Sequence, residues 1–250
     1  MWKHKKLVFF LFIVLLCVLG AAFWHLYETR IIRLNYEGFT VWLDCSRRGA
    51  VRFWYVAKRD GGNLERVHIF STDPRVPKKC QQKSTALYTS NEEVHYDRGH
   101  LVPANHFDHS QKALKQTNYI TNIVPQAREM NRGAWLRTEE IIECYRDTFE
   151  LVVVGGVLWG DNKADDYFLK SHGIATPDAF WKVIVRDGHD VIAWIIPNSA
   201  EAKRERLDTY IVSVADIENR IKQKIADVPR IHTDDRPEKS WPIPAGCSKK

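Results

Sequence analysis

The chain has 250 residues, a net charge of +6 with neutral histidines, and 44% hydrophobic residues. This length suits one large domain with an appendage or two small domains, and the nine Trp, nine Tyr and eleven Phe exclude a disordered polymer. The basic balance favours anionic partners, either nucleic acid or an anionic membrane surface, without choosing between them.

The chain begins with a basic segment, WKHKK, followed by the uncharged apolar run Leu7–Phe23. This order is typical of an export signal or a membrane anchor. Small residues at 20–22 leave signal cleavage open, and we favour an uncleaved anchor over a cleaved signal. Residues 1–27 are therefore assigned to a signal anchor or signal peptide. We expect the rest of the chain to lie outside the cytoplasm, either tethered to the inner membrane in the periplasm or secreted.

The cysteine content agrees with an oxidising compartment. Four cysteines follow Cys17, at positions 45, 80, 144 and 247, and no C-x-x-C motif occurs. An even number of cysteines outside the cytoplasm predicts two disulfides. Three pairings are open, and the sequence does not choose among Cys45, Cys80, Cys144 and Cys247.

The first part of the body reads as β structure. Residues 28–37 are interpreted as a juxtamembrane linker. The stretch 39–60 alternates apolar and polar residues around Arg48 and Gly49, which predicts a β-hairpin. Residues 71–93 contain several proline, serine and threonine residues and read as loop.

The second half adds further strands and helices. The apolar run 151–159 predicts a buried strand, and 180–198 predicts two strands joined by a turn. Residues 202–221 form a helix candidate that its β-branched residues weaken. A single mixed α+β domain over 38–228 is the economical interpretation, followed by a polar, proline-rich tail at 229–250.

The stretch 94–107, VHYDRGHLVPANHF, concentrates polar residues among apolar ones. A histidine can act as a general base near neutral pH, although a lone histidine is more often a surface or core residue. Here Asp97 and Arg98 can set the field around His100, and Gly99 permits an unusual backbone. The pattern predicts a strand end that projects the imidazole into a cleft.

A second polar run, 118–140, follows closely, and its GAWLRTEE segment opens an amphipathic helix. Asn131 stands at or just before the first turn, where an N-cap is the simple interpretation and a Mg²⁺ ligand the alternative. Glu139 lies eight residues further on, about 12 Å along a straight helix. Glu139 could therefore join Asn131 only across metal-bound water, and spacing alone favours the cap.

Three stretches, YDRGHLVPANHF, TNYITNIVPQAREMNRGAWLRTEE and GIATPDAFWKVIV, resemble in this order the signatures of the DNA/RNA non-specific endonucleases. This family includes secreted bacterial nucleases and mitochondrial endonuclease G. The resemblance spans roughly residues 38–215 and implies an α+β fold with a ββα-metal (His-Me finger) active site, a mixed sheet core and flanking helices. With the segment at the N-terminus, the chain is expected to carry one membrane anchor helix before this domain.

The resemblance also implies roles for individual residues. His100 falls on the general base and Asn131 on the single protein ligand for Mg²⁺, for which Mn²⁺ is the substitute. Glu139 falls on the acidic residue that holds metal-bound water. Arg98 is the arginine of the motif, and Asn122 falls on a second active-site asparagine. For Asn131, the resemblance reverses the preference for a cap.

The chain departs from the family at two arginines. His68 stands where an arginine is expected, with Arg66 two residues earlier, and Glu143 replaces an arginine one turn after Glu139. We therefore expect the substrate phosphate to be held by Arg98 together with one of three candidates: Arg66, Arg137 or Arg146.

The expected function is sugar-non-specific hydrolysis of DNA and RNA that leaves 5′-phosphate ends. Water activated by a histidine needs no 2′-OH, and backbone contacts carry little sequence information. The alternative is a catalytically weak cell-surface protein that binds DNA during uptake of external DNA, but the presence of both His100 and Asn131 favours the enzyme. Besides DNA and RNA, we expect the membrane as a partner through residues 7–23. A homodimer and an inhibitor protein are left open.

Overall fold

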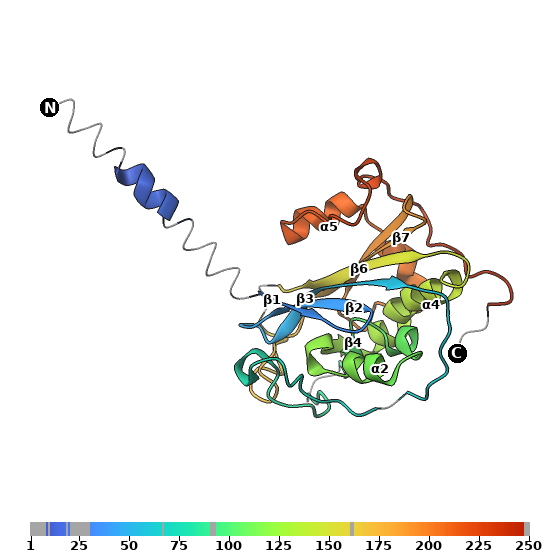
Figure 1. The fold of residues 1–250 in the computed structure, drawn as a ribbon, viewed down its shortest axis with the longest axis horizontal. Helices are drawn as coiled ribbons and strands as arrows, with labels where there is room; N and C mark the ends of the chain where they lie inside the picture. Colours follow the sequence, from blue (N-terminus) through green and yellow to red (C-terminus); the bar gives the residue numbers. More distant parts are fainter. Residues whose placement is uncertain are drawn as a thin grey trace.

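A computed structural model describes residues 9, 11–18, 20, 31–66, 68–90, 94–160 and 163–247. Its centre is a six-stranded antiparallel sheet with the strand order β1-β2-β3-β6-β7-β8, and a separate two-stranded sheet, β4-β5, lies beside it. Helices flank the large sheet (Figure 1). The expected α+β class with a sheet core is confirmed.

The strands predicted from apolar patterning are present in the large sheet. Its members are β1 (Ile31–Asn35), β2 (Phe39–Asp44), β3 (Gly49–Ala57), β6 (Leu151–Leu158), β7 (Ala179–Arg186) and β8 (Asp190–Pro197). The hairpin expected in 39–60 is β2–β3, and the two strands expected in 180–198 are β7–β8. Because both faces of β6 and β7 are covered, these strands read as nearly continuous apolar runs rather than as alternating ones.

The juxtamembrane linker assigned to residues 28–37 is wrong over its described part. Ile31–Asn35 forms β1, which pairs with β2 from Ile31 opposite Asp44 to Asn35 opposite Thr40. Leu34 is buried in the core. The sequence of this strand, IIRLN, has only five residues. A pattern this short does not distinguish a strand from a linker.

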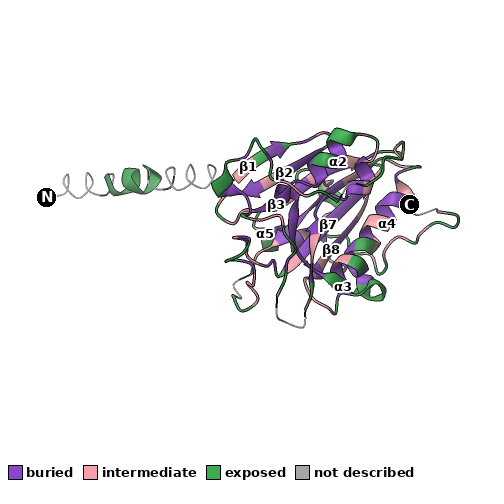
Figure 2. Cartoon of the chain, turned by 90° about the horizontal axis from the view of Figure 1, so that it is seen from below, coloured by how far each residue is buried: buried purple, intermediate pink, exposed green. Residues whose placement is uncertain are grey.

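The two faces of the large sheet are covered differently. The small sheet, β4 (Tyr96–His100) and β5 (Ile123–Ala127), lies on one side with α2 (Gln111–Thr117) and α4 (Leu136–Tyr145), and α5 (Val214–Ile221) lies on the other (Figure 1). Each side has its own apolar core, and the strands between them are buried (Figure 2). The remaining helical segments are short: η1 (Lys78–Cys80), η2 (Ala104–Phe107), η3 (Ile120–Asn122), α3 (Arg128–Met130), η4 (Asn131–Trp135), η5 (Arg204–Tyr210) and η6 (Arg230–His232).

The helix expected over 202–221 is broken in two. After η5, Ile211 forms a β-bridge with Trp194 of β8, so the chain is extended where a continuous helix would have passed. Ser213 then begins α5 with a capping box shared with Asp216. The β-branched residues around Ile211 favour this extended conformation.

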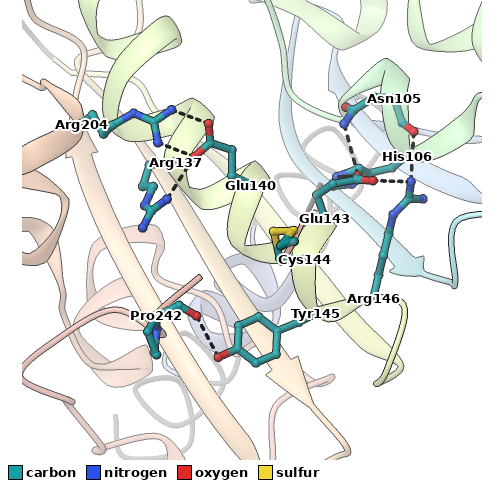
Figure 3. The surroundings of a disulfide bond; sticks show 11 residues. Asn105, His106, Arg137, Glu140, Glu143, Cys144, Tyr145, Arg146, Arg204 and Pro242 are labelled. Carbon is teal, nitrogen blue, oxygen red and sulfur yellow. Dashed lines mark hydrogen bonds and ion pairs between the residues drawn. A yellow bond between two sulfur atoms is a disulfide. The ribbon is translucent and has the colours of Figure 1, made fainter. Parts of the chain in front are cut away.

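The C-terminal tail is fixed to the domain. The two expected disulfides are present, and the structure pairs Cys45 with Cys80 and Cys144 with Cys247. The second disulfide joins the end of the tail to α4 (Figure 3). Tyr145, next to Cys144, also donates a hydrogen bond of 3.0 Å to the carbonyl oxygen of Pro242. The tail therefore constrains the C-terminal end of α4.

Only part of the expected anchor lies within the described residues. Residues 9, 11–18 and 20 are helical, and those whose burial is described are exposed (Figure 2). Within the described part of the chain, no helix has both the length and the apolar character needed to span a bilayer. The remaining residues of Leu7–Phe23 lie outside the described ranges, so the anchor stays a prediction.

Candidate active site

The small two-stranded sheet β4–β5 positions His100 at the end of β4, as the sequence predicts. His100 lies opposite Ile123, and Gly99 lies opposite Val124. A Cβ atom on Gly99 would lie 2.1 Å from the side-chain oxygen of Gln126. The glycine of the Asp-Arg-Gly-His motif is therefore required by this close approach, and it keeps β4 flat against β5 up to the histidine.

A buried asparagine sets the protonation of the His100 ring. The Nε2 atom of His100 lies 2.9 Å from Oδ1 of Asn118. Because an amide oxygen only accepts, Nε2 carries the proton, and the lone pair belongs to Nδ1. This second nitrogen lies 3.5 Å from Nη2 of Arg66. The basic atom of His100 therefore faces a cation suited to a phosphate. Asn118 is the first residue of the second polar run, 118–140. The sequence implies no role for it, because only the folded chain brings it to the His100 ring.

His100 is kept neutral by its surroundings. Burial, the largest cause, and the positive charge of Arg66 lower the pKa of His100 to about 3, although the hydrogen bond with Asn118 acts in the opposite direction. The side chain can therefore accept a proton throughout the physiological range. The negative charge of a phosphate beside Arg66 would offset the cation and make His100 a stronger base.

This lowered pKa predicts a contribution to acid unfolding. Unfolded His100 binds a proton below about pH 6.5, whereas the folded side chain stays neutral down to about pH 3. Its stabilising effect is therefore present above pH 6.5 and is lost as the pH falls through this window, by at most about 1.4 kcal/mol per pH unit. Urea titrations of the wild type and His100→Gln should show a shallower acid loss of unfolding free energy in the variant. His189→Gln, on an exposed turn, is the control, and parallel curves for His100→Gln and the wild type would contradict the assignment.

Asn122 does not serve as the second active-site asparagine that the resemblance implies. It is fully buried, and its side-chain amide donates to the carbonyl oxygens of Val102 at 2.9 Å and Thr117 at 2.8 Å. Its Oδ1 accepts from the Val102 amide at 3.0 Å. These backbone contacts occupy the side chain, so Asn122 fixes the segment that follows His100 instead.

Asn131 lies in a helical segment, directly after α3 and before the break at Gly133, and not at an N-cap. Its backbone is helical, with φ −57° and ψ −44°, because α3 precedes it directly. The side-chain Nδ2 donates to Oδ2 of Asp97 at 3.0 Å. Among the described residues nothing donates a hydrogen bond to its Oδ1. The N-cap interpretation is therefore wrong, and the contact leaves a hard carbonyl oxygen of the kind that Mg²⁺ prefers.

Asp97 orients Asn131 and stays ionised. Burial opposes ionisation of this carboxylate, but hydrogen bonds from Arg132 at 2.8 and 3.0 Å and from Asn131 outweigh it and lower its pKa. Arg128 lies 3.6 Å away as a second cation. The acidic residue of the motif thus joins β4 to the start of the helix.

A break in the helix allows close contact with a neighbouring segment. Gly133 has non-helical angles inside η4, and a Cβ there would lie 3.0 Å from the carbonyl oxygen of Ala202. The amide of Ala134 donates to that same oxygen at 3.1 Å. One turn of π-helix results, a feature common at functional sites. After it, the indole N–H of Trp135 donates to the carbonyl oxygen of His100 at 3.2 Å.

Glu139, which is half-buried, is electrostatically coupled to the fully buried Lys182. Burial raises the pKa of Glu139 to about 7, although Lys182, Arg66 and the Trp135 N–H favour the ionised form. Lys182 is fully buried in β7, where its Nζ donates to Thr138 at 2.6 Å and lies 3.6 Å from the centre of the Trp135 ring. Burial lowers the pKa of Lys182 to about 8, against the opposing effect of Glu139. The motifs imply no role for Lys182, although a lysine within the apolar strand FWKVIV is a usable signal.

Two of the arginine candidates lie at the site. Arg66 is exposed, and its Nη2 lies 3.5 Å from Nδ1 of the His100 ring. His68, which stands where the family has an arginine, is also exposed, and it lowers the pKa of His100 less than Arg66 does. Arg98 donates to the carbonyl oxygen of Thr85 at 2.8 Å and stacks 4.0 Å above the Phe70 ring, next to His100. The rim of the site is therefore cationic.

The other two candidates are engaged elsewhere (Figure 3). Arg137 pairs with Glu140 at 3.2 Å, and Arg204 binds the same carboxylate. Arg146 is buried, 2.8 Å from Glu143 and 3.1 Å from Asp60, so its prediction as a phosphate clamp is wrong. Glu143, which replaces a family arginine, serves as the internal partner of Arg146.

Within the described ranges, no group of three or more His, Cys, Asp or Glu side chains could hold a metal ion. Two side chains fit a divalent cation that is largely bound by water. They are Asn131, through its Oδ1 atom, and Glu139 of α4, through its carboxylate.

Comparisons with known proteins agree with this arrangement. Residues 26–228 match the sequence model of the family described as DNA/RNA non-specific endonuclease. The mitochondrial nuclease EXOG of Danio rerio is 31% identical over 170 residues, which cover 60% of this chain and 46% of that protein. Nuclease C1 of Cunninghamella echinulata var. echinulata is 30% identical over 173 residues, covering 64% and 67%. The chain spans about half the length of several of the curated relatives it matches.

A solved structure shares the fold. The crystal structure of a complex of EndoG with EndoGI, concerned with EndoG inhibition, matches with a TM-score of 0.63 at 21% identity and covers 80% of this chain and 88% of the solved one. Because it covers 80% of this chain, the likeness extends well beyond the motifs.

Proposed function

The chain belongs to the DNA/RNA non-specific endonuclease family, and we propose that it is a divalent-metal-dependent endonuclease that hydrolyses DNA and RNA. The observation that carries this proposal is the state of His100: a neutral imidazole with its proton fixed on Nε2 by Asn118 and its lone pair on Nδ1 beside Arg66. A general base requires such a lone pair next to the substrate.

His100 takes a proton from a water molecule at Nδ1 while the water oxygen attacks phosphorus. The bond to the 3′ oxygen breaks, the 3′ oxygen takes up a proton, and the phosphate stays on the 5′ side. As the ring becomes positive, Asn118 Oδ1, which accepts the hydrogen bond from Nε2, favours the imidazolium. The products are a 5′-phosphate and a 3′-hydroxyl.

Asn131 Oδ1 would hold the divalent cation, Mg²⁺ or its substitute Mn²⁺, and Glu139 would order the water around it. When bound, such an ion offsets the negative charge that develops on the phosphate oxygens. Asp97 keeps Asn131 in place through its contact with Nδ2. Lys182 favours the ionised form of Glu139 through its positive charge.

Arg66 is proposed as the main phosphate ligand and Arg98 as its neighbour. Arg66 is exposed and already within 3.5 Å of the ring that activates water. Arg98 is held flat over Phe70, which fixes its guanidinium beside the site without an acidic partner among the contacts described for it. Arg137 is less suitable because Glu140 neutralises it.

A cell-surface protein that binds DNA for uptake is the competing function. Both functions predict nucleic-acid binding, but only the enzyme cuts. Electrophoresis of the refolded protein in a gel that contains DNA or RNA, developed with Mg²⁺ and then with EDTA, separates them. Clearing that requires Mg²⁺ supports the nuclease, and binding without clearing under either condition would favour the uptake protein.

We also propose that residues 7–23 direct the domain out of the cytoplasm, as an inner-membrane anchor or a signal. The apolar, exposed side chains of the described residues 11–18 are the reason, together with two disulfides that need an oxidising compartment. A periplasm-active reporter fused after Lys250 should be active in bacteria. Activity of only a cytoplasm-active reporter at the same position would reject this topology.

A further inference from the structure

A second opening adjoins the His100 site. It is a cleft of about 640 Å³ between residues 64–71 and α2, and Asn118 contributes to its wall. The same Asn118 hydrogen-bonds the His100 ring. The cleft therefore begins one side chain away from the proposed general base.

The cleft has an apolar surface with polar edges. Leu64, Ile69 and Leu114 line it, and Ile69 and Leu64 keep 73% and 37% of their surface exposed to solvent. Hydrogen-bonding groups also line it, from Ser71, Gln111, Lys115, Glu65 and Asn118. Exposed apolar side chains that line a concave surface are typical of a ligand-binding site.

The loop that forms one wall is held at both ends. The Leu64 amide donates to the carbonyl oxygen of Asp108 at 3.1 Å, and the Ser71 amide donates to that of Asn118 at 3.3 Å. Between these contacts, the same loop carries Arg66 to His100. The same loop therefore lines one wall of the cleft and carries Arg66 at the His100 site.

We propose that this cleft binds the nucleoside adjacent to the scissile phosphate of a single-stranded substrate. The inference rests on the nuclease function proposed above. The aliphatic side chains match the face of a base, and the polar groups match its edge and the sugar, while Lys115 and Glu65 place one positive and one negative charge in the lining. Contact with the face of a base is tolerant of sequence, which agrees with a non-specific nuclease.

The proposed occupant also sets a preference for strandedness. A base within a duplex is stacked and paired, so it can enter the cleft only after unpairing, at a cost of a few kcal/mol. Single strands should therefore bind better than duplexes of the same sequence. A second copy of the chain, or its own apolar N-terminal segment, would make no such distinction.

The test uses single-stranded oligonucleotides in which one natural phosphodiester is flanked by phosphorothioate linkages. An abasic residue is placed on the 5′ side or the 3′ side of that bond, and KM and kcat are measured. For the wild type, the abasic residue on one side should raise KM about tenfold. Ile69→Ser should raise KM for the intact oligonucleotide by a similar factor and add nothing with the abasic one. Leu64→Ser provides a second variant, and Ile231→Ser, an exposed isoleucine on η6, is the matched control and should behave as the wild type.

The outcomes separate this inference from the nuclease function. Cleavage of all oligonucleotides with one KM, or an effect of Ile69→Ser that is equal with and without the base, would overturn the nucleoside subsite and leave the nuclease intact. A change in oligomeric state of Ile69→Ser without base dependence would overturn it as well. If the wild type cuts none of the oligonucleotides, the nuclease function itself fails.

Discussion

Replacing His100 by alanine should reduce cleavage of DNA and RNA by about three orders of magnitude, within the range of general-base contributions. The variant loses the lone pair on Nδ1, which lies 3.5 Å from Nη2 of Arg66. Nucleic-acid affinity should change little, because Arg66 and Arg98 remain. Cleavage of a labelled duplex measures the first effect, and fluorescence anisotropy in the presence of EDTA measures the second.

Two further variants make this result specific. His109→Ala removes an exposed histidine nine residues further on and should leave cleavage unchanged. Asn118→Ala keeps the imidazole but removes the acceptor that holds its proton on Nε2, so it should lower kcat by a smaller factor. Near wild-type turnover in a correctly folded His100→Ala protein would end the proposed mechanism.

Replacing Asn131 by alanine should raise the Mg²⁺ concentration needed for half-maximal cleavage by more than about tenfold. Mg²⁺ is expected to have few protein ligands here, so the loss of one is large. At saturating Mg²⁺, activity should recover in part, because His100 and Arg66 are intact. A magnesium titration of the initial rate measures both effects, and Mn²⁺ should be tested in parallel.

The control separates the metal from the contact with Asp97. Arg132→Gln weakens the other set of hydrogen bonds to that carboxylate but keeps the Asn131 oxygen, so the Mg²⁺ midpoint should move much less. An unchanged midpoint in Asn131→Ala together with a lower melting temperature would assign Asn131 a structural role only.

Sequence alone predicted the elements whose patterns are local. The β2–β3 hairpin, β6 and the β7–β8 pair have clear periodicity or uninterrupted apolar runs, and each was identified. β1 was missed because five residues carry little pattern, and its pairing with β2 is a tertiary contact. The helix over 202–221 failed at Ile211, where a bridge to Trp194 outweighs helix propensity.

The site was predictable to the extent that its motif has a chemical meaning at each position. The roles that the motif implies for His100, Asn131 and Glu139 remain predictions, and the structure adds the contacts from which the tests of these roles are designed. Asn122 has the same residue type as a site asparagine, and only its backbone partners reveal a structural position. Arg146 was misassigned because the sequence does not show which carboxylates it contacts. Its partners are Glu143, on the preceding turn of the helix, and Asp60, which is distant in sequence.

The substrate-facing arginine could be chosen only from the folded chain. Arg66, Arg137 and Arg146 are equivalent in sequence terms, and the structure distinguishes them by their partners. Arg137 and Arg146 face carboxylates, whereas Arg66 faces the imidazole. The contacts of Lys182 and Asn118 could likewise not be predicted from the sequence, because each side chain contacts a residue that is distant along the chain.

The central claim is that His100 activates water, so that the 2′-hydroxyl takes no part. The most direct measurement is cleavage of end-labelled DNA and RNA of one sequence, with and without 2′-O-methyl groups, followed by analysis of the ends. The proposed mechanism predicts that DNA, RNA and 2′-O-methylated RNA are all cut in Mg²⁺ and that every product carries a 5′-phosphate. Activity confined to RNA, abolished by 2′-O-methylation and leaving 2′,3′-cyclic phosphates, would show that the ribose hydroxyl is the nucleophile and would contradict the roles assigned to His100 and Asn131.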